Sequence, residues 1–327
     1  MQKRSACFYA ANSGVGLVAD VSLIQDLLFD EYDIDINYTQ QHIPLPGNEP
    51  PPVFADYDVG IFFQEYDIQW LSRNKTNILI ANEEWLQSPK LSTLKHFDKI
   101  ITKSSFAKQL LSPYNKNVIN CGFISKDRFN STIKKENKFI HALGKSSQKG
   151  TECILDTFIP SDNNLPITII ESRGGCTLDK LCNTPNFNYI KDFITEEAMN
   201  LEFNRNFIHL CPSYYEGWGH YLYEALSTGA LVYASKIPMF LEWIDPELVV
   251  FLDCNFIRSS EKISYFNLRD NFYPHQFGWQ VDQNILNEEV FNYKKHLENH
   301  KPELVRKFFK HLIEQNSKKL FLELTNV

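Results

Sequence analysis

Residues 207–235, FIHLCPSYYEGWGHYLYEALSTGALVYAS, place two short apolar runs on either side of a glycine-flanked turn and a helical segment. The first run, residues 207–211, has the length of a buried strand and is ended by a proline, so Glu216 falls in the loop at the strand's carboxyl end. We predict a helix from His220 that ends at Gly229, followed by a second buried strand. A strand, a helix and another buried strand in this order are typical of a parallel sheet, whose ligands bind at the carboxyl ends of the strands.

The same alternation fills the rest of the chain. A strand, a glycine-rich turn, a helix and a second strand are predicted over residues 7–38, and further short apolar runs follow up to residue 120. Residues 125–138 are polar and charged, which we interpret as a linker between domains. Alternation restarts at Phe139, and an amphipathic helix is predicted after Pro302. At 327 residues, the chain suits two α/β domains of parallel-sheet type.

Composition excludes several other classes of protein. The net charge of −7 argues against an extended nucleic-acid surface, which needs clustered positive charge. The 7 cysteines show no CxxC spacing, so neither a disulfide framework nor a zinc site is predicted. No apolar run approaches the roughly 20 residues of a membrane-spanning helix. We therefore expect a soluble cytoplasmic protein without an integral membrane segment; its oligomeric state is left open.

The glycine-flanked turn suits a ligand that carries phosphate and hydroxyl groups. Gly217 and Gly219 remove side chains on either side of a tryptophan, so backbone amides can approach a ligand where His220 begins the helix. Glu216 and Glu224 add two carboxylates, one in the loop and one on the helix. Ionised carboxylates accept several hydrogen bonds, and paired sugar hydroxyls donate them.

The whole string P-S-x-x-E-G-x-G-x-x-x-x-E-A-L-x-x-G-x-x-V resembles the Glu-x7-Glu signature of retaining GT-B glycosyltransferases, particularly family 4, the group 1 glycosyl transferases. The resemblance implies two Rossmann-like parallel-sheet domains facing a cleft. Residues 1–125 would form the acceptor-side domain and residues 126–302 the nucleotide-sugar donor domain. A C-terminal helix over about residues 303–327 would cross back to complete the first domain.

The resemblance also implies roles for the residues of this string. Glu216 would bind hydroxyls of the donor sugar and Glu224 the ribose of the nucleotide. His220 stands where the family usually has leucine, so it is either an added hydrogen-bond donor toward a phosphate or a half-exposed residue at a helix start. The donor-binding residues predicted from the string are Gly217, Gly219, His220, Tyr221 and Glu224.

A second segment, HALGKSSQKGTECIL, resembles the G-R-x-x-x-x-K-G segment whose cations hold the donor diphosphate in that family. Gly144, Lys145, Lys149 and Gly150 correspond to its four named residues, with Lys145 where arginine is common and with three residues between the two lysines where the family pattern has four. Lysine supplies a point charge in place of a bidentate fork. A leaving nucleoside diphosphate gains negative charge, so two ammonium groups and helix-start amides would lower the barrier. We therefore predict transfer without a metal ion; acidic pairs near residues 33, 56 and 65 offer too few ligands for one.

The amino-terminal turn supports a rival hypothesis. Gly14 and Gly16 lie in GVGLVA, which satisfies G-x-G-x-x-A, and Asp35 follows about 20 residues later. This pattern suits an NAD-dependent oxidoreductase of Rossmann type. GT-B amino-terminal domains carry a similar loop near the donor phosphates, so we include both glycines among the donor-binding residues.

The end of one further predicted strand is a candidate for contact with the acceptor. The predicted strand 77–81 runs into Asn82, Glu83, Glu84 and Trp85. The family often has a histidine near here, and retaining transfer is commonly discussed as front-face displacement without an enzyme nucleophile. Glu84 is a candidate for contacting the acceptor hydroxyl, and an ordinary loop acid is the alternative.

We predict a retaining hexosyltransferase that moves a hexose-type sugar from a UDP-, GDP- or ADP-sugar to a hydroxyl of a saccharide or other acceptor, without a separate cofactor. Glu216, Lys149, Lys145 and Glu84 would carry the chemistry. A non-catalytic GT-B partner subunit is the remaining alternative.

Overall fold

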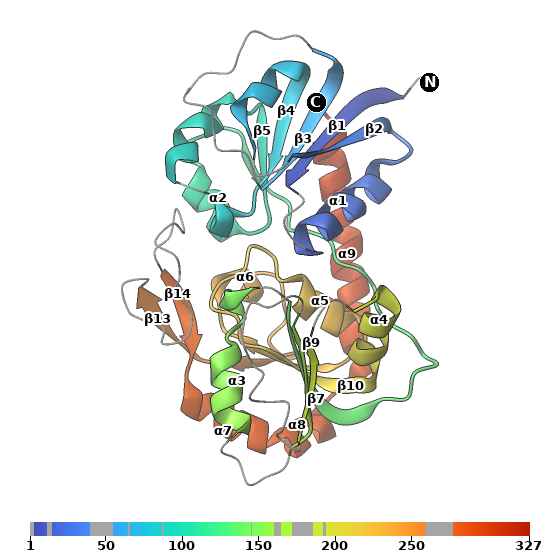
Figure 1. Ribbon diagram of the computed structural model, residues 1–327, viewed down its shortest axis with the longest axis vertical. Coiled ribbons are helices and arrows are strands. Elements are labelled where there is room, and N and C mark those ends of the chain that lie inside the picture. Colours follow the sequence, from blue (N-terminus) through green and yellow to red (C-terminus); the bar gives the residue numbers. More distant parts are fainter. Residues whose placement is uncertain are drawn as a thin grey trace. The chain divides into compact units, whose positions relative to one another are not determined.

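The structure is a computed structural model that describes residues 3–11, 15–39, 55–64, 66–86, 88–144, 146–159, 165–171, 186–191, 194–258 and 277–327. Two compact units divide the chain, the first including residues 1–124 and 313–327 and the second residues 125–270 and 276–312. Each unit contains a six-stranded sheet whose neighbouring strands run parallel (Figure 1). The α/β prediction is thereby confirmed.

The sheet of the first unit has the strand order β2-β1-β3-β4-β5-β6. Its strands are β1 (Arg4–Ala11), β2 (Tyr32–Thr39), β3 (Tyr57–Phe63), β4 (Asn74–Ile80), β5 (Lys99–Thr102) and β6 (Val118–Asn120). The helical elements of this unit are α1 (Val15–Leu28), the 3-10 segments η1 (Ile68–Arg73), η2 (Glu83–Trp85) and η3 (Ser88–His96), and α2 (Ser105–Leu111). The strand order reverses between β1 and β3, as it does in flavodoxin-like sheets.

The strands of the first unit are rich in Ile, Phe and Val because helices cover a parallel sheet on both faces. Tyr9 and Phe62, from neighbouring strands, stack with their ring centroids 4.4 Å apart in this core. The carboxyl end of the long helix α9 (Pro302–Thr325) also belongs here. Its Asn316 side chain donates to the Phe123 carbonyl oxygen at 2.8 Å, and Lys99 Nζ donates to the Glu323 carbonyl oxygen at 2.6 Å. The terminal helix therefore passes from one unit to the other, as predicted.

The sheet of the second unit has the order β12-β11-β10-β7-β8-β9. Its strands are β7 (Glu136–Gly144), β8 (Ile167–Glu171), β9 (Phe187–Lys191), β10 (Asn206–Cys211), β11 (Leu231–Ser235) and β12 (Val250–Leu252). Among its described residues before β12, the helical elements are η4 (Ser147–Lys149), α3 (Thr151–Phe158), α4 (Glu196–Arg205), α5 (His220–Ser227) and α6 (Pro238–Leu241). This order is that of a dinucleotide-binding fold, and the direction of winding reverses between β7 and β10.

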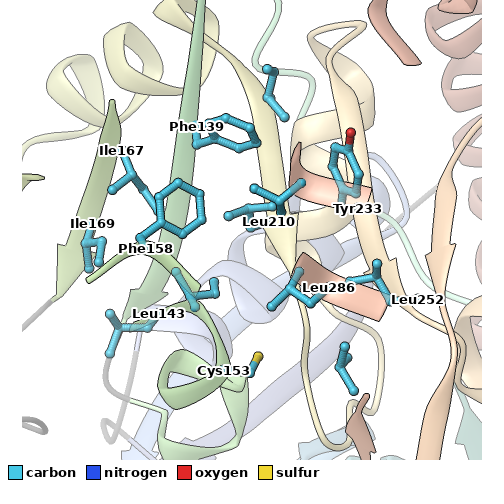
Figure 2. Close-up of a cluster of buried hydrophobic side chains, with 14 of the residues drawn as sticks. Phe139, Leu143, Cys153, Phe158, Ile167, Ile169, Leu210, Tyr233, Leu252 and Leu286 are labelled. Atoms are coloured by element: carbon cyan, nitrogen blue, oxygen red, sulfur yellow. The ribbon is translucent and has the colours of Figure 1, made fainter. Parts of the chain in front are cut away.

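Buried aromatic and aliphatic side chains hold the second sheet to its helices, as Figure 2 shows. The rings of Phe139 on β7 and Phe158 on α3 meet edge to face with centroids 5.2 Å apart. Leu210 and Tyr233 continue the cluster along β10 and β11. Each such side chain contributes roughly 1.5–3 kcal/mol by leaving water.

Two features of the second unit differ from the sequence interpretation. An antiparallel pair, β13 (Cys254–Arg258) and β14 (Phe277–Val281), leads into α7 (Gln283–Phe291) and α8 (Tyr293–Asn299), and none of these was predicted. The segment interpreted as a linker is also partly built into the fold, because Ser125 and Arg128 are buried and β7 already begins at Glu136. Polar composition alone does not separate a solvated linker from a segment whose charges find buried partners.

Two buried histidines, His141 on β7 and His209 on β10, make stability depend on pH. His141 Nδ1 lies 2.9 Å from the Leu210 carbonyl oxygen and Nε2 lies 3.0 Å from Thr151 Oγ1. His209 Nε2 lies 3.1 Å from the Phe203 carbonyl oxygen. Burial lowers the pKa of both imidazoles to about 4. The folded protein therefore keeps both rings neutral at a pH where the unfolded chain protonates them.

Lowering the pH from 7 to 5 is expected to reduce the free energy of unfolding by about 2 kcal/mol for each of these histidines. The unfolded pKa is about 6.5, so this stability is present above that pH and is lost as the pH falls toward the folded pKa. Urea unfolding of wild type and of His141→Gln at both pH values measures the effect. The variant should lose less stability than wild type over this interval, whereas the exposed control His311→Gln should lose the same amount. An equal pH dependence in wild type and His141→Gln would contradict the assignment.

Candidate functional site

The Lys149 and Glu216 side chains meet where the winding of the second sheet reverses. Lys149 ends η4 in the loop after β7, and Glu216 lies in the loop after the neighbouring strand β10. Lys149 Nζ lies 2.5 Å from Glu216 Oε1, and the two side chains are only 15% and 11% exposed. Two residues that the sequence singled out 67 positions apart thus form one mostly buried ion pair.

Ser213 and Tyr221 complete the surroundings of this pair. Ser213 Oγ donates to Glu216 Oε1 at 2.5 Å and lies 2.6 Å from the Tyr221 hydroxyl. Because Ser213 has a single proton and gives it to the carboxylate, Tyr221 is the donor in the second bond. Burial raises the pKa of Tyr221 well above its usual value, so the hydroxyl keeps its proton. Lys149 Nζ also lies 4.0 Å from the centre of the Tyr221 ring, a cation–π contact.

The loops after β7 and β10 approach each other at backbone level. The Tyr214 amide donates to the Gln148 carbonyl oxygen at 2.8 Å. Gly150 has a φ of +64°, and a Cβ atom there would lie 2.0 Å from the Pro212 carbonyl oxygen. Gly219 has a φ of +88° and faces the Phe240 ring, which a Cβ would approach to 2.7 Å. Glycine is therefore required at both positions by the backbone conformation and by the space.

Glu224 on α5 pairs with a residue that sequence reasoning missed. Arg128 Nε donates to Glu224 Oε2 at 2.6 Å, and both side chains are about nine-tenths buried. Arg128 also donates to Glu196 and Asn200 on α4. Burial lowers the pKa of the arginine, but the neighbouring Glu224 and Glu196 outweigh this effect and the net shift is upward. No pattern in the polar run around Arg128 distinguishes it from its exposed neighbours.

His220, the first residue of α5, is half-buried. Its Nδ1 lies 3.0 Å from Ser125 Oγ, which also accepts a hydrogen bond of 2.9 Å from Trp218 Nε1. Gly217 is buried in the loop before it. The hydrogen bond at Nδ1 thus ties this side chain to Ser125 at the amino terminus of the helix.

The remaining predicted residues are placed as follows. Gly144, at the end of β7, has a φ of +61°, and Gly16 is exposed within the first turn of α1, not in the turn before that helix. Glu84 belongs to the first unit, where η2 follows the carboxyl end of β4, and it is half-buried. Gly14 and Lys145 lie outside the described residues.

Neither a metal cluster nor a membrane span is present in the described part of the chain. Within those ranges, no group of three or more His, Cys, Asp or Glu residues is arranged to hold a metal ion. No helix there has the length and apolar character needed to cross a bilayer.

Comparison with known proteins gives structural relatives only. No family model and no curated protein sequence matches this chain. Three solved structures superpose over nearly all of it: a glycosyltransferase from Rickettsia africae (TM-score 0.66, 12% identity, 99% of both chains), HepE from Anabaena in complex with UDP and glucose (0.64, 11%, 98% of this chain and 100% of the other) and sucrose-phosphate synthase from Thermosynechococcus elongatus (0.63, 12%, 98% and 96%). The chain therefore has the GT-B fold of these proteins, which the motif around Glu216 predicted.

Proposed function

We propose that the protein is a retaining glycosyltransferase that moves a hexose-type sugar from a nucleoside-diphosphate sugar to an acceptor hydroxyl without a metal ion. The observation that carries the proposal is the mostly buried pair of Lys149 and Glu216 at the switch point of the second sheet. Residues 126–302 would form the donor domain. Residues 1–125, completed by the C-terminal helix, would form the acceptor-side domain.

Lys149 and Glu216 supply complementary groups for the two sides of the bond that breaks, which joins the donor sugar to the diphosphate. Lys149 has three ammonium protons and gives one to Glu216, so the others can reach oxygens of the departing diphosphate. Glu216 keeps acceptor capacity for hydroxyls of the sugar. Fixed charges in a site with little water stabilise developing charge without reorganising, and this is the largest contribution to rate enhancement in many enzymes.

Other predicted residues take supporting roles in the proposal. Glu224 would bind the ribose, and Lys145, Gly14 and the amides around Gly16, Gly144, Gly217 and Gly219 would line the diphosphate. His220 would add a hydrogen-bond donor toward a phosphate, and Tyr221 would belong to the same donor site. Glu84 would contact the acceptor hydroxyl.

The structural relatives support a nucleotide-sugar donor. HepE was solved with UDP and glucose, and a pneumococcal O-GlcNAc transferase that superposes with a TM-score of 0.55 was solved with UDP and GlcNAc. The nicotinamide alternative gains no support from Asp35, which is exposed on the edge strand β2 and accepts a hydrogen bond of 2.8 Å from the Tyr57 hydroxyl.

A thermal-unfolding screen with UDP, GDP, ADP and their glucose conjugates tests the proposal. A ligand at 100 times its dissociation constant should stabilise the protein by about 2.7 kcal/mol. The donor so found is then incubated with saccharide acceptors, and NMR of the new anomeric centre should show retention. Stabilisation by NADH with none from the nucleotides would favour the oxidoreductase. Tight nucleotide binding without transfer or donor hydrolysis would favour the partner subunit, and an inverted product would refute retention.

A further inference from the structure

The Arg128 guanidinium contacts the Glu224 carboxylate on α5 and also two residues of α4, Glu196 and Asn200. We propose that Arg128 is a positioning residue that orients Glu224 toward the ribose hydroxyls of the donor nucleotide. The inference rests on the proposed function, because it assigns Glu224 a ligand. It adds a residue from the segment just after the boundary of the two units, Ser125 being the first residue of the second unit.

Arg128 is held at both its backbone and its side chain. Its amide donates to Ser227 Oγ at 2.9 Å, and its carbonyl oxygen accepts from Asn204 Nδ2 at 2.6 Å. Its Nη1 donates to Asn200 Oδ1 at 2.6 Å and to Glu196 Oε1 at 2.9 Å. The guanidinium carbon also lies 5.2 Å from the centre of the Phe203 ring. Because the planar guanidinium is fixed by these contacts, its Nε–H group points in one direction only.

The partner of the Nε–H group is Glu224, and the contact is one-sided. Arg128 Nε donates to Glu224 Oε2, and within the described residues no hydrogen bond to Oε1 is found. One oxygen is thus fixed and the other is left to accept hydrogen bonds. Vicinal ribose hydroxyls are matched donors for a carboxylate held in this way.

An ion pair is a poor choice for packing alone, because apolar side chains of similar volume stabilise a buried site equally well or better. Its presence beside an acid with a proposed ligand therefore favours an orienting role. The chain also supplies a matched control. Lys126, two residues earlier, pairs with the same Glu196, but its side chain is 47% exposed and has no contact with Glu224 among the described residues.

The experiment measures affinity by calorimetry for wild type, Arg128→Met, Arg128→Lys and Lys126→Met. The ligands are UDP, GDP and ADP, and then the 2′,3′-dideoxy analogue of the one that binds wild type most tightly. Replacing Arg128 by methionine should weaken binding of the nucleoside diphosphate by about tenfold to a hundredfold, which corresponds to the free energy of a charge-assisted hydrogen bond. The dideoxy analogue lacks the hydroxyls, so its affinity should change by less than about twofold. Arg128→Lys should recover part of the loss, and Lys126→Met should bind both ligands as wild type does.

Thermal unfolding without ligand checks that each variant folds. Because Arg128→Met leaves Glu224 buried without its cation, Glu224→Gln and the double variant Arg128→Met/Glu224→Gln are also made. The double variant should bind the nucleoside diphosphate no more weakly than Glu224→Gln alone, since Arg128 acts only through Glu224. Two results would overturn the positioning role. In one, the losses of affinity of the two single variants multiply in the double variant; in the other, Arg128→Met weakens binding of both ligands equally. Binding of no nucleoside diphosphate by wild type would instead overturn the proposed function, and this inference with it.

Discussion

Replacing Lys149 by methionine is expected to lower kcat/KM for sugar transfer by about a thousandfold, the upper range for removing one group that stabilises developing charge. The ammonium group lies 2.5 Å from Glu216 and is held over the Tyr221 ring, so a departing diphosphate would meet a cation already in place. Methionine is an unbranched side chain one atom shorter, and it removes the charge together with the N–H donors. Steady-state kinetics with the donor found by the unfolding screen measures the effect, and the exposed Lys236→Met serves as the control.

A structural and a chemical role for the Lys149–Glu216 pair are separated by the double variant Lys149→Met/Glu216→Gln. The single variant leaves a mostly buried carboxylate without its cation and should lose about 3 kcal/mol of stability. The double variant removes that carboxylate charge and should regain most of this stability, while transfer stays at least as slow as in the single variant. Recovery of transfer together with stability would show that the pair only holds the loops, and the proposed role of Lys149 would be wrong.

Gly150→Ala is expected to cost at least about 4 kcal/mol of stability or to prevent accumulation of folded protein, a loss outside the range of ordinary substitutions. The new Cβ would lie 2.0 Å from the Pro212 carbonyl oxygen, a backbone atom that cannot rotate away, and the residue has a φ of +64°. Relief would require the loops after β7 and β10 to separate, which would also part Lys149 from Glu216.

Two other glycines allow the contributions to be separated by urea unfolding. Gly144 has a φ of +61°, but a Cβ atom there would have no neighbour within 4 Å among the described residues, so Gly144→Ala should cost only the conformational strain of about 1–2 kcal/mol. Gly16 lies in α1 with open space around it, so Gly16→Ala should stabilise the protein by up to about 1 kcal/mol. A cost for Gly150→Ala no larger than that for Gly144→Ala would contradict the close approach to Pro212.

The sequence predicted much of the fold because the signals it used are local. Apolar runs placed every strand of the first sheet and all of the second sheet except β12, and Gly229, with a φ of +74°, follows the end of α5 as expected. The antiparallel pair of β13 and β14 joins residues far apart in the chain, and no local pattern indicates such a pairing.

The residues of the candidate site also divide into those with a local sequence signal and those without one. Lys149 and Glu216 each lie beside glycines at a strand end, so the sequence pointed to both of them, and the parallel sheet brings them together. Arg128 and Ser125 gave no such signal, because burial and a partner on α5 define their roles and neither property is local. Ser213 lay within the motif, but only its hydrogen bond to Glu216 gives it a role.

The passage of α9 between the units bears on the order in which the protein can fold on the ribosome. The strands of the first sheet are complete by residue 120, but Leu320 and Leu324, which are fully buried, and Asn316 are synthesised only after the whole second unit. At roughly 5–20 residues per second, the interval is on the order of 10–40 s. During this time the first unit lacks part of its apolar cover, so the domain made first is finished last.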